Sequence, residues 1–373
     1  MRVLIDYRSA LRGRSGAGEY VHRLVMALAS AFPPDRSARP LELTIFSSSW
    51  TDRLATPPDL GAATIVDRRI PVSLLNFSWH RLEWPPAEML TGASFDVTHS
   101  FHPLLLPARR AAQVVTIHDL NFLSHPERTR SEVRRDYPAL VRGHAHRADR
   151  VVVPSRFTAV EVERRLDLPS DRIAICPPGA PNWTPRSSTP EAGYVLFLGT
   201  LEPRKNLGAL LDAYEQLLAR GRVPELVLAG RATTQARPWL DRIARAPLAG
   251  HVRHIGYVDA DSQRALYDGA RVLVQPSFEE GFGLSVLEAM TAGVPVVAAS
   301  RGALPEVLGD AGVLVDPDQP EALAAGLARL LSDEGFARTC SARGVARSHS
   351  FRWSDTAARV YEVYERAIER KAL

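Results

Sequence analysis

Cysteine and lysine are the scarcest residue types in this sequence, with two of each, and the chain has no long apolar run. Cys176 and Cys340 lie far apart and lack the spacing of a metal site, so the sequence fits a reducing compartment. No run approaches the roughly 18 apolar residues that a membrane-spanning helix needs. The first apolar run ends at Asp6, too early for a signal peptide. We therefore expect a cytoplasmic protein.

The shortage of lysine makes one lysine informative. Of the 46 Lys and Arg residues, only Lys205 and Lys371 are lysine, which indicates a general bias toward arginine wherever either cation serves. Lys371 lies at the carboxyl end of the chain, where it carries little information. Lys205 stands in a glycine-led loop, and its persistence there indicates a position that requires a compact ammonium group. The net charge of +4 is too small to indicate a nucleic-acid-binding protein.

The length and the order of apolar runs predict the architecture. A chain of 373 residues with 45% hydrophobic and 24% charged residues is expected to form about two globular domains. Strand and helix patterns alternate through both halves, which predicts two doubly wound α/β domains, 1–180 and 194–353, joined by a proline-rich linker. A last amphipathic helix covers 354–373. The strands are expected at 3–5, 41–46, 63–66, 95–98, 113–117, 151–153 and 173–175, and then at 194–198, 226–229, 252–255, 272–274, 295–298 and 313–315.

One segment of the second half combines a strand end, a glycine loop and a helix start. An apolar strand stops at Pro276, Gly281 and Gly283 follow, and a helix with apolar residues at helical spacing comes next. Glycines allow a ligand to approach the backbone closely, and a helix amino terminus attracts a phosphate. Glu280 and Glu288 flank this turn. A carboxylate beside a phosphate site would repel the ligand unless it faced hydroxyl groups. A ligand with a sugar ring on each side of a diphosphate would supply such hydroxyl groups to both glutamates.

Glu280 and Glu288, with Gly-Phe-Gly-Leu between them, resemble the E-x7-E signature of the retaining glycosyltransferases of family 4. These enzymes have the GT-B fold, in which two Rossmann-like domains face each other across a cleft and the last helix crosses back to the first domain. The resemblance covers nearly the whole chain and is strongest over 112–180 and 194–316. It implies that Glu288 holds ribose hydroxyls and that Glu280 holds the transferred sugar.

Two further stretches resemble the same family. The loop Gly199-Thr200-Leu201-Glu202-Pro203-Arg204-Lys205-Asn206 is similar to the family's Gly-x-x-x-Pro-Arg-Lys-Asn loop, which brings cations onto the donor diphosphate. A common variant of this loop has arginine directly after the glycine, where this chain has Thr200. The departure leaves Arg204 and Lys205 as the expected cations. The strand end before His118 and Asp119 resembles the family's cleft-facing histidine, which implies a hydrogen bond from His118 to the transferred sugar. Asp119 either orients that histidine or caps the next segment.

Two other stretches of the sequence each allow two interpretations. Gly16 and Gly18 stand in a loop that opens a helix, either because a tight turn needs glycine or because the loop approaches the donor. They lack the third glycine of a dinucleotide-binding fingerprint. The Arg- and His-rich helical stretch 127–150 is either a solvated face or a surface for peripheral contact with anionic lipid headgroups at the inner face of the membrane.

The resemblance therefore implies a retaining glycosyltransferase. We expect it to need no metal, since no Asp-x-Asp pair is expected in a cleft loop while fixed cations and a helix terminus are available for the diphosphate. The strings around His118 and Lys205 most resemble mannosyltransferases of polysaccharide assembly, so GDP-mannose is the expected donor and a hydroxyl compound the acceptor. UDP- and dTDP-sugars are the alternative donors. A carbohydrate phosphorylase and a bilobed sugar-binding protein are the alternatives from other classes. The resemblance implies His118, Glu280, Lys205 and Arg204 as catalytic residues, and as donor-binding residues Glu288, Gly281, Phe282, Gly283, Leu284, Ser285, Gly199, Thr200, Val258, Gly16 and Gly18.

Overall fold

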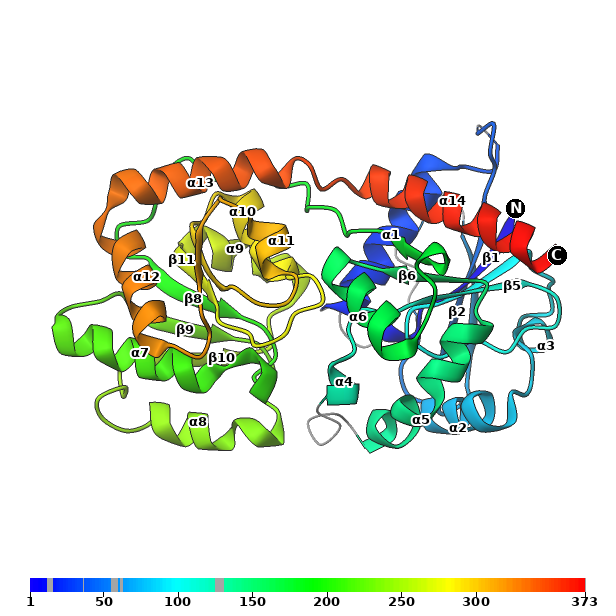
Figure 1. The fold of residues 1–373 in the computed structure, drawn as a ribbon, viewed down its shortest axis with the longest axis horizontal. Coiled ribbons are helices and arrows are strands. Elements are labelled where there is room, and N and C mark those ends of the chain that lie inside the picture. Colours follow the sequence, from blue (N-terminus) through cyan, green and yellow to red (C-terminus); the bar gives the residue numbers. More distant parts are fainter. Residues whose placement is uncertain (12–15, 36, 55–59, 61–62, 125–130, 373) are drawn as a thin grey trace. The chain divides into compact units, whose positions relative to one another are not determined.

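The computed structural model describes residues 1–11, 16–35, 37–54, 60, 63–124 and 131–372 (Figure 1). The chain divides into two compact units. The first unit comprises Met1–Gly179 and Arg352–Leu373, and the second comprises Ala180–Phe351. Each unit is built on one parallel sheet with helices on its faces (Figure 1). The prediction of two doubly wound α/β domains is confirmed.

The seven-stranded sheet of the first unit has the order β3-β2-β1-β4-β5-β6-β7, and every pair in it is parallel. The order reverses beside β1, and the carboxyl ends of the strands at such a reversal are where this class of sheet binds ligands. The strands are β1 (Arg2–Asp6), β2 (Glu42–Ser48), β3 (Thr64–Arg68), β4 (Val97–Ser100), β5 (Ala112–Thr116), β6 (Arg150–Val153) and β7 (Ile173–Ile175). The helices are α1 (Ala17–Ala31), α2 (Val72–Phe77), the single π-helical turn η3 (Ser78–Leu82), α3 (Ala87–Thr91), α4 (Asn121–Ser124), α5 (Ser131–Arg147), α6 (Arg156–Leu166) and α14 (Trp353–Ala372).

The six-stranded sheet of the second unit has the order β10-β9-β8-β11-β12-β13 and is also parallel. Its two faces carry separate apolar cores, one under α7 and α12 and the other under α10 and α11. The strands are β8 (Tyr194–Leu198), β9 (Leu226–Ala229), β10 (Val252–Gly256), β11 (Ala270–Gln275), β12 (Val296–Ala299) and β13 (Val313–Val315). The helices are α7 (Leu207–Arg220), α8 (Arg237–Ile243), α9 (Ala260–Gly269), α10 (Leu284–Ala292), α11 (Leu304–Leu308), α12 (Pro320–Ser332) and α13 (Glu334–Ser348).

The last helix, α14, belongs to the first unit, as the sequence predicted. Its apolar stripe packs against α1, where the Tyr361 ring stacks on Phe32 with 4.2 Å between centroids. The hydroxyl of Tyr364 lies 2.8 Å from Nδ1 of His99 on β4, so the helix is also hydrogen-bonded to the sheet. In the part of the chain that the structure describes, neither α14 nor another helix is both long enough and apolar enough to cross a membrane.

Local capping explains where two helices begin. The side chain of Ser155 accepts a hydrogen bond from the amide of Thr158 at 3.1 Å, which confirms Ser155 as the predicted N-cap of α6. The helix predicted to start at Asn206 begins at Leu207 instead. Asn206 has a φ of +56°, a left-handed conformation outside a helix, and its side-chain Nδ2 donates to the Pro317 carbonyl at 2.7 Å.

Candidate active site

The glycine loop between β11 and α10 gives the second unit a helix start that no side chain caps. Gly283 is the N-cap of α10 and has a φ of +108°, a conformation that L side chains rarely adopt. A Cβ atom there would lie 2.7 Å from Cδ2 of Leu304. The first amides of a helix have no partner within the helix itself. The amides of Leu284 and Ser285 are therefore placed to bind an anion.

Glu280 is the buried centre of this loop. Its carboxylate accepts hydrogen bonds from Gln275 Nε2 at 2.8 Å and from Ser277 Oγ at 2.9 Å, and it forms an ion pair with Lys205. Arg204 Nη1 lies 3.3 Å from its second oxygen. Burial alone would raise the pKa of Glu280, but the charges of Lys205 and Arg204 and these hydrogen bonds lower it to about 2. Glu280 is therefore ionised at neutral pH.

The predicted lysine loop supplies both cations, Lys205 from 75 and Arg204 from 76 residues before Glu280. Lys205 and Arg204 form a single 3-10 turn after β8, and Lys205 is buried. Gly199 lies beside this lysine, where a Cβ atom would make an ordinary van der Waals contact of 3.6 Å with Cε of Lys205. Arg204 also pairs with Glu202 at 2.6 Å. Thr200, beside Gly199, is half-buried.

The ammonium group of Lys205 has three protons to donate, and its ion pair with Glu280 uses one of them. It can therefore keep that contact while it donates to a phosphate.

Glu288 lies one turn into α10 and is held from α9. Gln263 Nε2 and Tyr267 OH each donate to Glu288 Oε2 at 2.7 Å. Gln263 and Tyr267 are four residues apart, so they lie on the same face of α9. Tyr267 is fully buried, and burial together with the charge of Glu288 raises its pKa well above the usual value. The carboxylate is thus fixed in direction before any ligand arrives.

Sequence reasoning did not identify the four residues that hold the two glutamates. Gln275 and Ser277 position Glu280, and Gln263 and Tyr267 position Glu288. The spacing of four between Gln263 and Tyr267 indicates that they share one face of a helix. The sequence does not show which residue that face contacts. These contacts depend on the packing of α9 on α10.

Phe282 does not present its side chain to a ligand. It is buried in the core under α10, and its ring meets Phe351 edge to face at 5.8 Å between centroids. A contact from Phe282 to a donor would come from its backbone. Val258, which follows β10, is half-buried and packs against the same core.

His118 follows β5 in the first unit, at the carboxyl end of the sheet. Its ring meets Tyr20 of α1 edge to face at 5.2 Å between centroids. Burial lowers the pKa of His118 to about 4, although Asp119 opposes the shift, so the ring is neutral at neutral pH. Its Nε2 is buried and has no hydrogen-bond partner among the described residues, which suits a ligand contact. Asp119 caps the next segment, because its Oδ1 accepts from the amide of Asn121 at 3.1 Å.

The two amino-terminal glycines differ in their backbone. Gly16 is the N-cap of α1 with a φ of +55°, so the turn itself favours glycine there. Gly18 lies within the helix and is buried. Residues 12–15 of the predicted loop are outside the described part of the chain. In the stretch 127–150, residues 127–130 are outside it too, as are the side chains of 131–136.

Two family profiles match the chain. Residues 14–181 match the family described as "Glycosyltransferase Family 4", and residues 192–333 match "Glycosyl transferases group 1". The O-antigen chain mannosyltransferase B of Escherichia coli is 34% identical over 70% of this chain and 72% of its own length. The phosphatidyl-myo-inositol mannosyltransferase of Mycolicibacterium smegmatis is 32% identical over 78% of each chain.

Solved structures share the fold across the whole chain. Sucrose-phosphate synthase from Thermosynechococcus elongatus superposes with a TM-score of 0.78 at 22% identity, covering 98% of each chain. The Anabaena HepE protein in complex with UDP and glucose superposes with a TM-score of 0.70 at 18% identity, covering 97% of this chain and 98% of the other. These similarities establish the GT-B fold that the sequence predicted.

Proposed function

Since this chain belongs to glycosyltransferase family 4, we propose that it is a retaining enzyme that moves mannose from GDP-mannose to an acceptor hydroxyl. The acceptor is a hydroxyl of a glycan, a glycolipid or a small molecule. Mannose is favoured because the relatives at 34% and 32% identity are both named mannosyltransferases. The observation that carries the proposal is the buried pair of Lys205 and Glu280 beside the start of α10.

The donor diphosphate takes its position from charge and dipole. Lys205 and Arg204 donate to its oxygens, together with the amides of Leu284 and Ser285 at the positive end of α10. These donors stabilise the negative charge that develops on the leaving diphosphate as the glycosidic bond breaks. No metal ion is needed for this task, because fixed cations already supply the positive charge.

The sugar rings are placed by the two glutamates and the histidine. Glu288 accepts from the ribose hydroxyls, and its direction is set by Gln263 and Tyr267. Glu280 and the neutral ring of His118 bind the mannosyl group. No further side chain is assigned as a nucleophile, so the leaving phosphate accepts the acceptor proton, and the acceptor attacks the face from which the phosphate departs.

The test is a transfer assay in the presence of EDTA with GDP-mannose and a simple mannoside acceptor. We expect GDP release with formation of an α-mannosidic bond, read from the anomeric proton by NMR. A β-linked product would refute retention, and turnover only after addition of Mg²⁺ or Mn²⁺ would refute the metal-independent mechanism.

A second donor class has one observation in its favour. The HepE structure, which shares the fold, holds UDP and glucose. Turnover with UDP- or dTDP-sugars and none with GDP-mannose would establish that alternative. A phosphorylase would require a lysine bound to pyridoxal phosphate. Absence of visible absorbance from the purified protein would exclude it.

A further inference from the structure

The first unit exposes a cluster of large apolar side chains. The described residues contain eight exposed large hydrophobic side chains, and five of them fall within the twenty residues 72–91. Single exposed apolar residues are normal on soluble proteins, whereas a cluster marks a surface that binds something. The five are Leu74, Phe77, Leu82, Trp84 and Met89, with exposed fractions between 49% and 64%.

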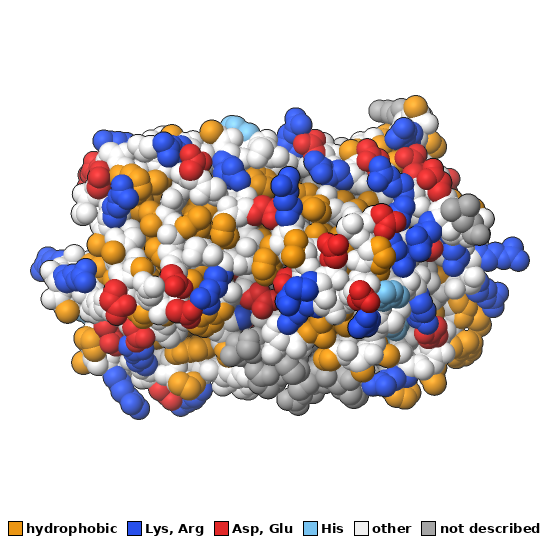
Figure 2. Space-filling view, viewed as in Figure 1, with side chains coloured by type: hydrophobic (Ala, Val, Ile, Leu, Met, Phe, Trp, Pro, Cys, Tyr) orange, Lys and Arg blue, Asp and Glu red, His pale blue; other side chains and the backbone are white. Residues whose placement is uncertain are grey.

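These side chains are exposed although other residues of the same segment are buried in the core. The same segment contributes Leu75 and Trp79 to the apolar core beneath it, and both are almost fully buried. Leu74 and Phe77 lie one turn apart on the opposite side of α2 and face outward. Figure 2 shows hydrophobic side chains gathered at the lower right, on the side of the first unit where Figure 1 places α2 and α3.

Arginine dominates the charge around this cluster. Among the described residues from 63 to 110, the exposed charged side chains are five arginines and one glutamate. That glutamate, Glu83, is neutralised by an ion pair with Arg147 at 2.6 Å. The surface is therefore complementary to a negatively charged partner. The five arginines are Arg68, Arg69, Arg81, Arg109 and Arg110.

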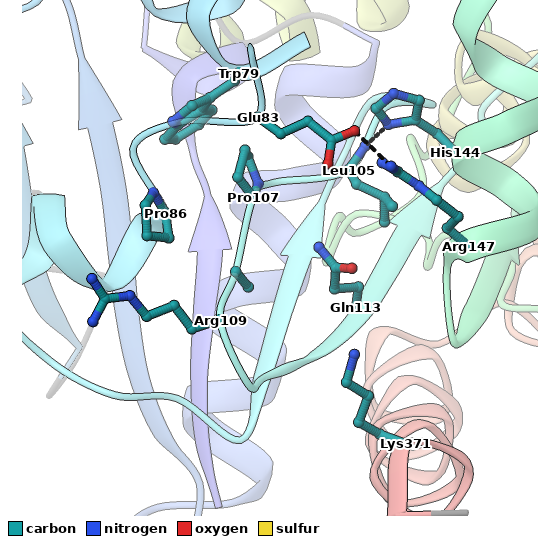
Figure 3. Close-up of a pocket in the computed structure, with 11 residues that line it drawn as sticks. Trp79, Glu83, Pro86, Leu105, Pro107, Arg109, Gln113, His144, Arg147 and Lys371 are labelled. Carbon is teal, nitrogen blue, oxygen red and sulfur yellow. Dashed lines mark hydrogen bonds and ion pairs between the residues drawn. The ribbon is translucent and has the colours of Figure 1, made fainter. Parts of the chain in front are cut away.

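A cavity of about 460 Å³ adjoins the cluster (Figure 3). Trp79, Glu83 and Pro86 line it from the apolar segment, and Arg109 and Lys371 line it from other parts of the unit. Figure 3 shows the Lys371 amine pointing toward Gln113, the second residue of β5. The cavity thus lies at the amino end of this strand, whereas His118 follows the carboxyl end. Within the first unit, the cavity is therefore separate from His118.

We propose that residues 72–91, with the arginines and the cavity beside them, form a docking face for a bilayer that contains anionic phospholipids. The exposed apolar side chains enter the interfacial region, where tryptophan in particular is favoured. The arginines and Lys371 bind the lipid phosphates. A bilayer surface presents apolar groups directly beneath phosphates, and this face has an apolar centre with an arginine rim.

This face overlaps the lipid contact that the sequence suggested on 127–150 only at the cavity, which His144 and Arg147 also line. His144 of that stretch is buried, and burial together with Arg147 lowers its pKa to about 4, so it carries no charge at neutral pH. Arg147 is paired with Glu83. The neighbouring segment 72–91 presents the apolar side chains that a membrane contact needs.

Vesicle co-sedimentation of the full chain tests the proposal. We expect binding to vesicles of equal parts phosphatidylglycerol and phosphatidylcholine, and little binding to phosphatidylcholine alone. The double variant Phe77→Ser/Trp84→Ser should bind about tenfold more weakly, and so should Arg109→Glu/Arg110→Glu. The matched controls are Val160→Ser, an exposed apolar residue of α6, and Arg222→Glu/Arg245→Glu, two exposed arginines of the second unit. Both controls should bind as the wild type does.

Three results would overturn the proposal. One is absence of binding to both kinds of vesicle, and another is equal loss in the variants and their controls. The third is a dimer in light scattering that Phe77→Ser/Trp84→Ser converts to a monomer, because the face would then join two copies of the chain. Circular dichroism of each variant checks folding. The charge-reversal variant leaves the apolar side chains in place, so it tests the proposal even if the serine variant misfolds.

Discussion

Lys205 and Glu280 are each buried, so each is stabilised by the charge of the other. Removing one partner of a buried ion pair leaves an uncompensated charge, which typically costs about 3–5 kcal/mol. A single substitution at either residue therefore mixes a loss of stability with a loss of function. A pair of substitutions separates the two.

We expect Lys205→Met and Glu280→Gln each to lower the melting temperature, and the double variant to recover much of the loss. Nucleoside diphosphate affinity should stay about ten- to a hundredfold weaker in Lys205→Met and in the double variant, since a charged hydrogen bond to phosphate is worth roughly 1.5–3 kcal/mol. Calorimetric titration with GDP and thermal melting together measure this. Wild-type affinity in the stable double variant would contradict a role for Lys205 in binding the diphosphate.

The contribution of Glu280 to the stability of the protein should depend on pH in the acid range. Its pKa is about 2 in the folded protein and 4.5 ordinarily, so its stabilisation is complete above about pH 4.5 and is lost as the pH falls toward 2. The gap in melting temperature between wild type and Glu280→Gln should therefore narrow as the pH is lowered from 6 to 3. Glu191→Gln, at an exposed carboxylate, is the control and should show a small, constant gap. A gap that widens on acidification would contradict the assignment.

The hydroxyl of Tyr267 should matter for donor binding through Glu288. Ribose contacts are made equally in the ground and transition states, so their loss raises KM more than it changes kcat. We expect Glu288→Gln to raise donor KM with a modest change in kcat, and Tyr267→Phe to do the same to a smaller extent. Tyr214→Phe is the matched control, because Tyr214 is equally buried and donates to the Pro224 carbonyl at 2.8 Å. An equal rise in KM for both tyrosine variants would refute a specific positioning role.

The glycine turn is the element on which the donor site depends. Gly283→Ala places a methyl group 2.7 Å from Leu304 in a left-handed backbone conformation, so strain of order 1–3 kcal/mol should shift the start of α10. We expect lower stability and weaker GDP binding. Gly293→Ala, at the other end of the same helix with a φ of +74°, is the control. It should lose stability and keep GDP affinity, and loss of affinity in both variants would contradict the role of the α10 start.

Short-range patterns predicted most of the elements. The strand that ends at Pro276, the glycine loop and α10 were expected from residues that are neighbours in sequence, and so were Ser155 as an N-cap and the apolar stripe of α14. Segment 72–91 was not predicted. Its helices α2 and α3 have six and five residues, too short for a helical period to emerge.

Contacts that depend on how elements pack were beyond the sequence. The ion pair between Lys205 and Glu280 joins residues 75 positions apart, and the Tyr267 contact to Glu288 depends on how α9 lies against α10. The resemblance suggested that these charged residues act on a ligand. It gave no indication that they also act on one another.

The two units have separate apolar cores, and this should appear in the unfolding of the whole molecule. The cores of the first unit include α1 and α14, whereas those of the second include α7, α10, α11 and α12. Multidomain proteins often unfold in more than one step. The residues that the proposed function assigns to the donor diphosphate and ribose belong to the second unit: Lys205, Arg204, Leu284, Ser285 and Glu288.

A nucleoside diphosphate should therefore stabilise mainly the transition that belongs to the second unit. At about 100 times its dissociation constant, a ligand adds about 2.7 kcal/mol to the stability of the state that binds it. We expect calorimetric scans in EDTA to show the largest shift with GDP and smaller shifts with UDP, dTDP and ADP. The Lys205→Met variant should show little shift with any of them, which separates binding at this site from a general salt effect. A larger shift with UDP than with GDP would mean that the donor carries uracil and not guanine. A shift that requires added Mg²⁺ would mean that the fixed cations do not suffice for the diphosphate.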